Sequence, residues 1–137
     1  MGDLPFGVKQ RAPTPSEMSF FKRSGIPGYA ADDGFVVLSP SPASNVNTEA
    51  VARNEAARVF MRQNKDFSPN FKLTPAQESF LNGTEYARAS TAQRRETIAA
   101  RIFSGDPSAQ QPTEEQLGFV RRLSAASKGS LMSRARK

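Results

Sequence analysis

Prolines and glycines occur throughout the chain, and they limit the length of every regular element that it can form. The sequence holds ten prolines and nine glycines in 137 residues. Proline interrupts helices and central strands, and glycine favours turns and helix ends. The ordered part must therefore consist of short elements joined by loops. It forms one modest domain, because a chain of this length cannot supply two full cores.

Four segments carry the signature of a helix start, in which a serine or threonine is followed three residues later by glutamate or glutamine. Such a capping box satisfies backbone amides that have no partner inside the helix. The signature predicts helices that begin after Thr14, Thr74, Ser90 and Thr113. The first three are expected to end near Gly25, Gly83 and Gly105. The fourth runs from about Glu114 into the C-terminal segment.

The longest predicted helix covers about Glu49 to Gln63, with Thr48 as its cap. Its apolar stripe has helical spacing and comprises Ala52, Ala56, Val59 and Phe60. The arginines at positions 53, 58 and 62 are expected to face elsewhere. Glu55 and Arg58 lie three residues apart, and we interpret them as a surface ion pair rather than as a catalytic carboxylate with its orienting partner.

Residues 28–38 change from helical to strand character. Two largely apolar stretches, 28–31 and 35–38, flank the sequence Asp32-Asp33-Gly34. Asp-Gly supplies the positive backbone torsions of a tight turn, so we expect a β-hairpin here. A hairpin alone is marginally stable and needs a helix or a neighbouring chain over it. The two aspartates are interpreted as turn residues, not as paired catalytic acids.

The net charge of +6 comes from the C-terminal end of the chain. Residues 1–120 contain 13 basic and 13 acidic side chains, and no carboxylate follows Glu115. The excess lies in Arg121, Arg122, Lys128, Arg134, Arg136 and Lys137. Small polar residues separate these charges, so we expect a mobile basic tail and a candidate anion-binding site. Nucleic acid, an acidic protein surface and simple solvation are all open interpretations of this tail.

The helix after Ser90 is a second candidate for phosphate contacts because it carries Arg94, Arg95 and Arg101. Glu96 and the small residues between these arginines weaken that interpretation. The sequence also lacks zinc-finger ligands, an aromatic sheet signature and a helix-turn-helix pattern. Nucleic-acid binding, if present, is therefore expected to be nonspecific.

The first 13 residues are predicted to form an extended arm, because Pro5, Gly7 and Pro13 disfavour a helix or a central strand. Ten phenylalanines are spread over the chain, including its irregular segments. Aromatic side chains dominate the energies of protein interfaces. We therefore predict that Phe6, Phe67 and Phe71 contact a partner. Core filling is the competing interpretation for the rings on helices.

Cysteine and histidine are both absent from the sequence. Their absence removes disulfides, thiolate and imidazole metal ligands, and every Ser-His or Cys-His nucleophile. We expect no metal, no cofactor, no small-molecule substrate and no catalytic residue; an enzyme that uses carboxylates alone is the remaining catalytic alternative. No apolar run approaches the roughly 18 residues of a membrane span, so no membrane segment is expected.

These patterns predict a mainly α fold with one small β-hairpin, in which short helices are joined by Pro/Gly-rich loops. The predicted organisation has an extended arm over 1–13, a small helical domain over 14–120 with the hairpin near 28–38, and a basic tail over 121–137. Hydrophobic residues make up 37% of the chain. That share is below the globular average, so we expect a thin core that a partner completes.

Four segments, LPFG at 4–7, GYAADDGFVVLSP at 28–40, NEAARVFMR at 54–62 and RETIAARIFSGDPS at 95–108, carry a resemblance. They resemble small proteins encoded among the virion genes of short-tailed, podovirus-like bacteriophages. The resemblance implies a virion structural protein at the tail or the head-to-tail junction. Its partners would be other virion proteins in a symmetric assembly. The alternative is a nonspecific nucleic-acid-binding protein that acts through the basic C-terminal tail.

Overall fold

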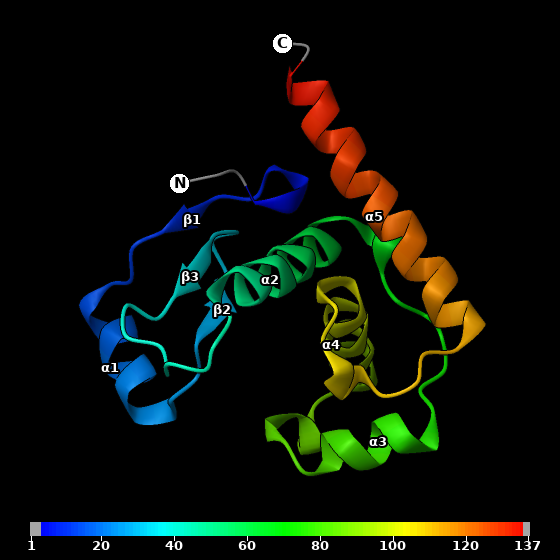
Figure 1. Cartoon of the computed structure of the whole chain (residues 1–137), viewed down its shortest axis with the longest axis horizontal. Helices are drawn as coiled ribbons and strands as arrows, with labels where there is room; N and C mark the ends of the chain where they lie inside the picture. The colour runs from blue at the N-terminus through cyan, green and yellow to red at the C-terminus, as the bar shows by residue number, and fades with distance from the viewer. Residues whose placement is uncertain (1–3, 136–137) are drawn as a thin grey trace.

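The computed structural model describes residues 4–135, and the side chains of residues 4–128. This part of the chain forms five α-helices and a small three-stranded sheet, which confirms the mainly α fold (Figure 1). The α-helices are α1 (Pro15–Ser24), α2 (Thr48–Gln63), α3 (Pro75–Asn82), α4 (Thr91–Ser104) and α5 (Glu114–Ala135). The strands are β1 (Gln10–Arg11), β2 (Gly28–Ala30) and β3 (Val36–Leu38). Short 3₁₀ helices are η1 (Pro5–Gly7), η2 (Lys65–Phe67), η3 (Glu85–Arg88) and η4 (Pro107–Ala109).

The helix boundaries follow the local sequence signals closely. All four predicted capping boxes are present, each with its two reciprocal hydrogen bonds. Gly25 and Gly105 end α1 and α4 in the left-handed conformation, with φ values of 72° and 78°. The cap of α2 differs from the prediction: Asn47, not Thr48, accepts a hydrogen bond from the Ala50 amide at 3.1 Å. Thr48 is instead the first helical residue.

The predicted hairpin is confirmed as the antiparallel pair β2–β3, with Gly34 at a φ of 88° in its turn. The sheet gains a third strand, because β1 pairs in parallel with β3 and gives the order β1-β3-β2. Residues 10–11 of the predicted extended arm are therefore an edge strand of the sheet. Phe6, from the same segment, is buried in the core.

The sheet lies between two helices that cover its opposite faces. Phe21 of α1 packs with Val37 and Tyr29 on one face. Ala30 and Val36 belong to the main core, to which α2 contributes, on the other face. The hairpin thus has the cover that it needs, and the cover comes from this chain itself.

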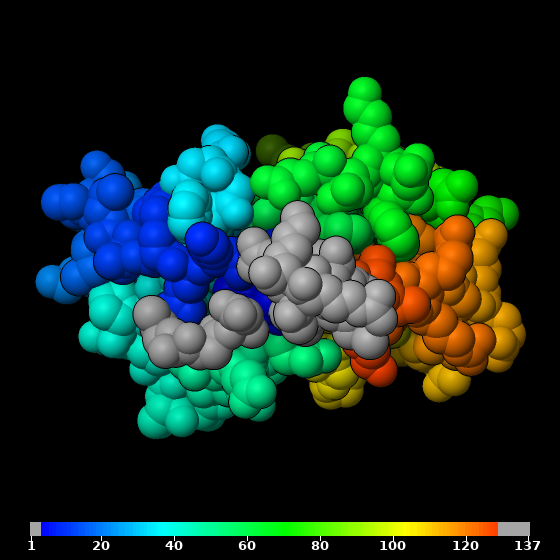
Figure 2. All heavy atoms as spheres, turned by 90° about the horizontal axis from the view of Figure 1, so that it is seen from above, coloured from blue at the N-terminus to red at the C-terminus, as the bar shows by residue number. Residues whose placement is uncertain are grey.

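The main core joins α2, α4 and α5. Its fully buried members include Ala56, Leu81, Ile98 and Leu123. The segment around η1 packs against both α2 and α5, so the first described residues and α5 share one face of the molecule (Figures 1 and 2). The N-terminal segment therefore connects the first half of the fold to the last helix.

The predicted basic tail does not begin as a separate segment. Helix α5 continues without interruption across residue 121 to Ala135. Leu123 is fully buried and Ser127 is nearly so, which ties residues 121–128 to the core. The predicted run of this helix from about Glu114 into the C-terminal segment is confirmed, whereas a separate mobile tail from residue 121 is wrong for residues 121–128, because they pack on the core. None of the helices in the described part has the length and apolar character that crossing a bilayer requires.

Candidate functional site

A cleft of about 790 Å³ lies between the hairpin and the C-terminal end of α4. Strand β2 and the residues before it line one side, and η3 with residues 104–107 line the other. Helix α2 lies between these two sides (Figure 1). The volume falls in the range of about 300–1,000 Å³ that is usual for ligand sites. This cleft is the candidate functional site.

The cleft contains a buried ion pair from one face of α2. Arg58 Nε lies 3.2 Å from Glu55 Oε1, and the two residues are only 6% and 8% exposed. The predicted pairing is present, but its predicted surface position is wrong. Charged residues are buried almost only where they are paired, so the surroundings of Glu55 and Arg58 need a structural account.

The Arg58 guanidinium is held by three further side chains from three elements. Its Nε donates to Asn54 Oδ1 at 2.9 Å, and Nη2 donates to Thr97 Oγ1 of α4 at 2.5 Å. Nη1 donates to the hydroxyl of Tyr86 in η3, whose ring also lies 5.3 Å from the guanidinium carbon. A planar guanidinium with several fixed donors suits this role. Arg58 therefore joins α2, α4 and η3 at the cleft.

The pKa values of Glu55 and Arg58 are both raised, but for different physical reasons. Burial raises the pKa of the Glu55 carboxyl above its ordinary value, although the positive charges of Arg58 and Arg62 oppose the rise. Burial also disfavours charge on Arg58, but Glu55 and Tyr86 together raise the pKa of the guanidinium. Arg58 is thus charged at every relevant pH.

The other cations of the cleft lining are also paired. Arg62 Nη2 lies 2.9 Å from Glu96 Oε1, and Arg62 Nη1 donates to the carbonyl of Ala30 at 3.2 Å. Arg101 Nη1 lies 3.5 Å from Asp106 Oδ2. The lining therefore presents polar and charged atoms that already compensate one another. Such a lining favours an occupant with main-chain polar groups over a simple anion.

Sequence reasoning did not find this site, because its residues are distant in the sequence. Tyr86 and Thr97 gave no motif, and the spacing of Glu55 and Arg58 is equally typical of an exposed pair. One local signal existed: Ala56 and Ala57, which lie between Glu55 and Arg58 in the sequence, are both fully buried. Charges within such a short run of small apolar residues indicate a helix that is buried on more than one face.

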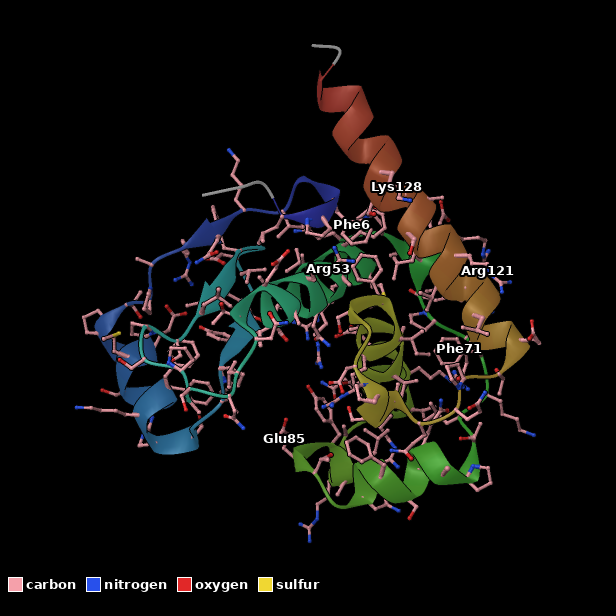
Figure 3. All side chains as sticks on the ribbon, viewed as in Figure 1. Phe6, Arg53, Phe71, Glu85, Arg121 and Lys128 are labelled. Carbon is pink, nitrogen blue, oxygen red and sulfur yellow. The ribbon has the colours of Figure 1, made fainter. Side chains whose placement is uncertain are left out.

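The three phenylalanines predicted to contact a partner lie against the chain's own core. Phe6 is 7% exposed and stacks on Phe60 at 4.3 Å, and Phe71 is 1% exposed against Phe119. Figure 3 shows both rings directed into the molecule. Partner contact through Phe6 and Phe71 is therefore corrected to core filling, because neither ring has free surface. Phe67 is partly buried, and its partner contact stays a prediction.

The candidate anion-binding residues fall into two groups. Arg121, Arg122 and Lys128 are exposed on α5. Figure 3 labels Arg121 and Lys128. The side chain of Arg134 and the whole of Arg136 and Lys137 lie outside the described residues. The three exposed cations remain a prediction as an anion-binding site.

The arginines weighed as a phosphate-binding face of α4 have other roles. Arg94 Nη1 donates to the Tyr86 carbonyl at 2.8 Å, and Arg101 Nη1 donates to Ser108 Oγ at 2.6 Å. The Nε of Arg95 is buried and has no hydrogen-bond partner among the described residues. Because their donors face the protein, Arg94 and Arg101 do not form a phosphate-binding face with the tail.

One of the two turn aspartates, Asp33, also has a structural role. Asp33 Oδ1 accepts from the Phe35 amide at 3.1 Å, and Asp33 Oδ2 accepts from Arg11 Nε at 2.8 Å. Over the described residues, no group of three aspartates or glutamates is placed to hold a metal ion.

Comparisons of the chain with family models, with curated proteins and with solved structures find no match.

Proposed function

We propose that this protein is a structural component of a bacteriophage virion that packs against other virion proteins at the tail or the head-to-tail junction. The sequence resemblance to virion proteins of short-tailed phages motivates the assignment to virion structural proteins. The observation that carries the packing role is that α1 exposes two large apolar side chains.

The two exposed apolar side chains are Met18 and Phe20, at 44% and 37% exposure, and because they are two residues apart they project from nearly opposite sides of the helix. The Phe20 ring lies 5.8 Å from that of Tyr29, so its apolar surface extends from the helix onto the sheet. Lys22 and Arg23 follow in the last turn of α1. A partner with an apolar contact and flanking carboxylates complements Phe20 and these cations, and covering the part of each apolar side chain that is still exposed contributes about 1 kcal/mol.

Substituting both Met18→Ser and Phe20→Ser in the phage genome tests this role. Because both side chains lie outside the core and only Phe20 contacts other rings, the purified variant should retain its helical content and lose no more than about 2 kcal/mol of stability. Its copy number in purified particles should fall by about tenfold or more. The matched control substitutes the exposed Ala92→Ser and Ala125→Ser. Normal incorporation of the α1 variant would contradict packing through α1.

A second candidate function is nonspecific nucleic-acid binding by α5, and one observation favours it. Arg121 and Lys128 lie two helical turns apart and therefore project from the same face, with Arg122 beside them. Binding of labelled duplex DNA should then weaken steeply with salt. Arg121→Gln with Lys128→Gln should reduce the slope of log K against log salt by about two. An absence of DNA binding at low salt would exclude this function.

A further inference from the structure

Strand β2 forms one edge of the sheet, and this edge borders the cleft. The Ser39 amide donates to the Pro27 carbonyl at 2.9 Å, which fixes the alternation of the β2–β3 ladder. In an antiparallel pair, hydrogen-bonded and non-hydrogen-bonded residues alternate. Gly28 and Ala30 are therefore non-hydrogen-bonded positions. Their backbone groups point away from β3, toward the cleft, where Gly28 is partly exposed and Ala30 is 7% exposed.

Most of these edge groups have no partner. The Ala30 carbonyl accepts from Arg62 Nη1 at 3.2 Å. Within the described residues, the amide and carbonyl of Gly28 and the amide of Ala30 make no hydrogen bond. An unpaired row of this kind is a template for another strand unless a helix, a bulge or a charge blocks it. Here Arg62 covers one end of the row, at the Ala30 carbonyl, and the cleft lies beside the other three groups.

We propose that the cleft binds an extended peptide segment of a neighbouring protein, which adds a strand beside β2. About three residues of such a segment would pair with all three free backbone groups, in either strand direction. Main-chain hydrogen bonds supply the affinity in this mode of recognition, and alternate side chains enter the cleft. This inference deepens the proposed function, because it names the segment by which a partner engages the protein.

The charge of the cleft indicates which residue types a bound extended segment carries. The cleft arginines 58, 62 and 101 each have a carboxylate partner. Glu85 is exposed on η3, lines the cleft and points into the gap beside it (Figure 3). It forms no ion pair in the described part of the chain. The occupant is therefore expected to carry a lysine or arginine beside the residues that pair with β2.

Amide hydrogen exchange on the intact chain tests the strand addition. The probes are a pool of short, end-blocked peptides that alternate valine or threonine with lysine. Binding should slow the exchange of the Gly28 and Ala30 amides by about tenfold or more, because these groups gain partners. The Tyr29 amide should change less, since it already pairs with β3. Unchanged exchange at Gly28 and Ala30 with every peptide at about 1 mM would overturn the proposal.

Backbone N-methylation of the best-binding peptide separates strand pairing from other contacts without altering the protein. Methylating the alternate residues that face β2 should weaken binding by about tenfold or more. Methylating the other alternate set should leave binding nearly unchanged. Equal effects of the two sets would contradict pairing with β2.

Glu85→Gln tests the charge preference, and Glu114→Gln, outside the cleft lining, is the control with the same change in charge. Glu85→Gln should weaken binding of the lysine-bearing peptide several-fold at low salt, whereas Glu114→Gln should not. Equal affinity of the two variants for this peptide would contradict the expected lysine or arginine in the bound segment. Because these measurements use the isolated chain, their failure is distinguishable from absence of the protein from virus particles, which would contradict the virion role.

Discussion

Arg58 is the residue on which the geometry of the cleft depends most. It is buried beside Glu55 and bonded to side chains of α4 and η3. Burying two charges is expensive, and good geometry offsets that cost only while both partners are present. The pair therefore contributes less to net stability than to fixing one arrangement of α2, α4 and η3.

Removing one partner should therefore cost more than removing both. Arg58→Met leaves Glu55 buried without its counter-charge and should lower the free energy of unfolding by about 3–5 kcal/mol. Glu55→Leu combined with Arg58→Met should recover a large part of that loss. Urea unfolding followed by circular dichroism measures both values. A loss below about 1 kcal/mol for Arg58→Met would contradict the buried pair.

A second charged residue, Glu17, fixes the start of α1 to the sheet. Arg11 donates to both carboxylate oxygens, at 2.7 and 2.9 Å, and the Thr14 amide donates at 2.9 Å. The hydroxyl of Tyr29 is a further donor. The Arg11 hydrogen bonds, with those of Tyr29 and Thr14, hold the pKa of Glu17 far below its ordinary value.

This lowered pKa predicts a pH-dependent contribution to stability. A carboxylate whose folded-state pKa lies below its unfolded value stabilises the fold above the unfolded value, about 4.3, and loses that effect as pH falls. Glu17→Gln should therefore lower the urea midpoint at neutral pH. The difference from the wild type should shrink steadily below about pH 4. A difference that is constant from neutral to acidic pH would contradict the assignment.

Residue environments were the least predictable part of this fold. The i, i+3 spacing of Glu55 and Arg58 is the same on a surface and in a core, and only the distant Tyr86 and Thr97 distinguish the two cases. The turn role of Asp33 was predictable because it depends on neighbouring backbone. Local chemistry was thus visible in the sequence, and long-range burial was not.

At the scale of elements, two capping boxes bond directly to each other. Gln77 of α3 and Gln116 of α5 are fully buried, and each amide donates to the carbonyl oxygen of the other, at 2.7 and 2.8 Å. Each side-chain oxygen also accepts the amide of its own cap residue. The starts of α3 and α5 are therefore fixed together by one satisfied polar network.

Breaking this network should destabilise both helix starts. Gln116→Ala removes half of a capping box and leaves the buried Gln77 amide with fewer partners, for an expected loss of about 1–3 kcal/mol. Ser90→Ala, in a capping box that is exposed and isolated, should cost about 1 kcal/mol. Urea unfolding compares the two. A smaller loss for Gln116→Ala than for Ser90→Ala would contradict the coupling.

Element boundaries were largely predictable, because caps and glycine stops act over a few residues. The run of the helix after Thr113 into the C-terminal segment was predicted too, but composition wrongly favoured mobility from residue 121. The decisive residue is Leu123, which is fully buried and holds this part of the helix on the core. Its partners come from elsewhere in the fold, so charge composition alone gave the wrong result.

At the scale of the whole molecule, the N-terminal segment closes the fold. Phe6 lies in the core with Phe60 and Phe103, at ring distances of 4.3 and 5.4 Å. Strand β1 then pairs in parallel with β3. Both contacts join residues that are far apart in the sequence, so no local pattern indicated them and the segment was predicted to be an extended arm. The cleft was unpredictable for the same reason, because its lining also comes from distant segments.

Phe6→Ala should therefore act as a core substitution. The expected loss is about 3–5 kcal/mol, because a buried ring is removed and a cavity remains. Thermal and urea unfolding measure this loss, and Phe20→Ala, on an exposed ring, is the control. A loss for Phe6→Ala no larger than that of the control would contradict the docked position of the segment.

The measurement that most directly tests the proposed function is quantitative mass spectrometry of virus particles purified from the source of this sequence. The virion proposal predicts that the protein is present at a fixed copy number relative to the major capsid protein, and that this number is a multiple of a tail or connector symmetry. Absence of the protein from intact particles would contradict the proposal and favour a nonstructural role, with nucleic-acid binding by α5 as the next function to test.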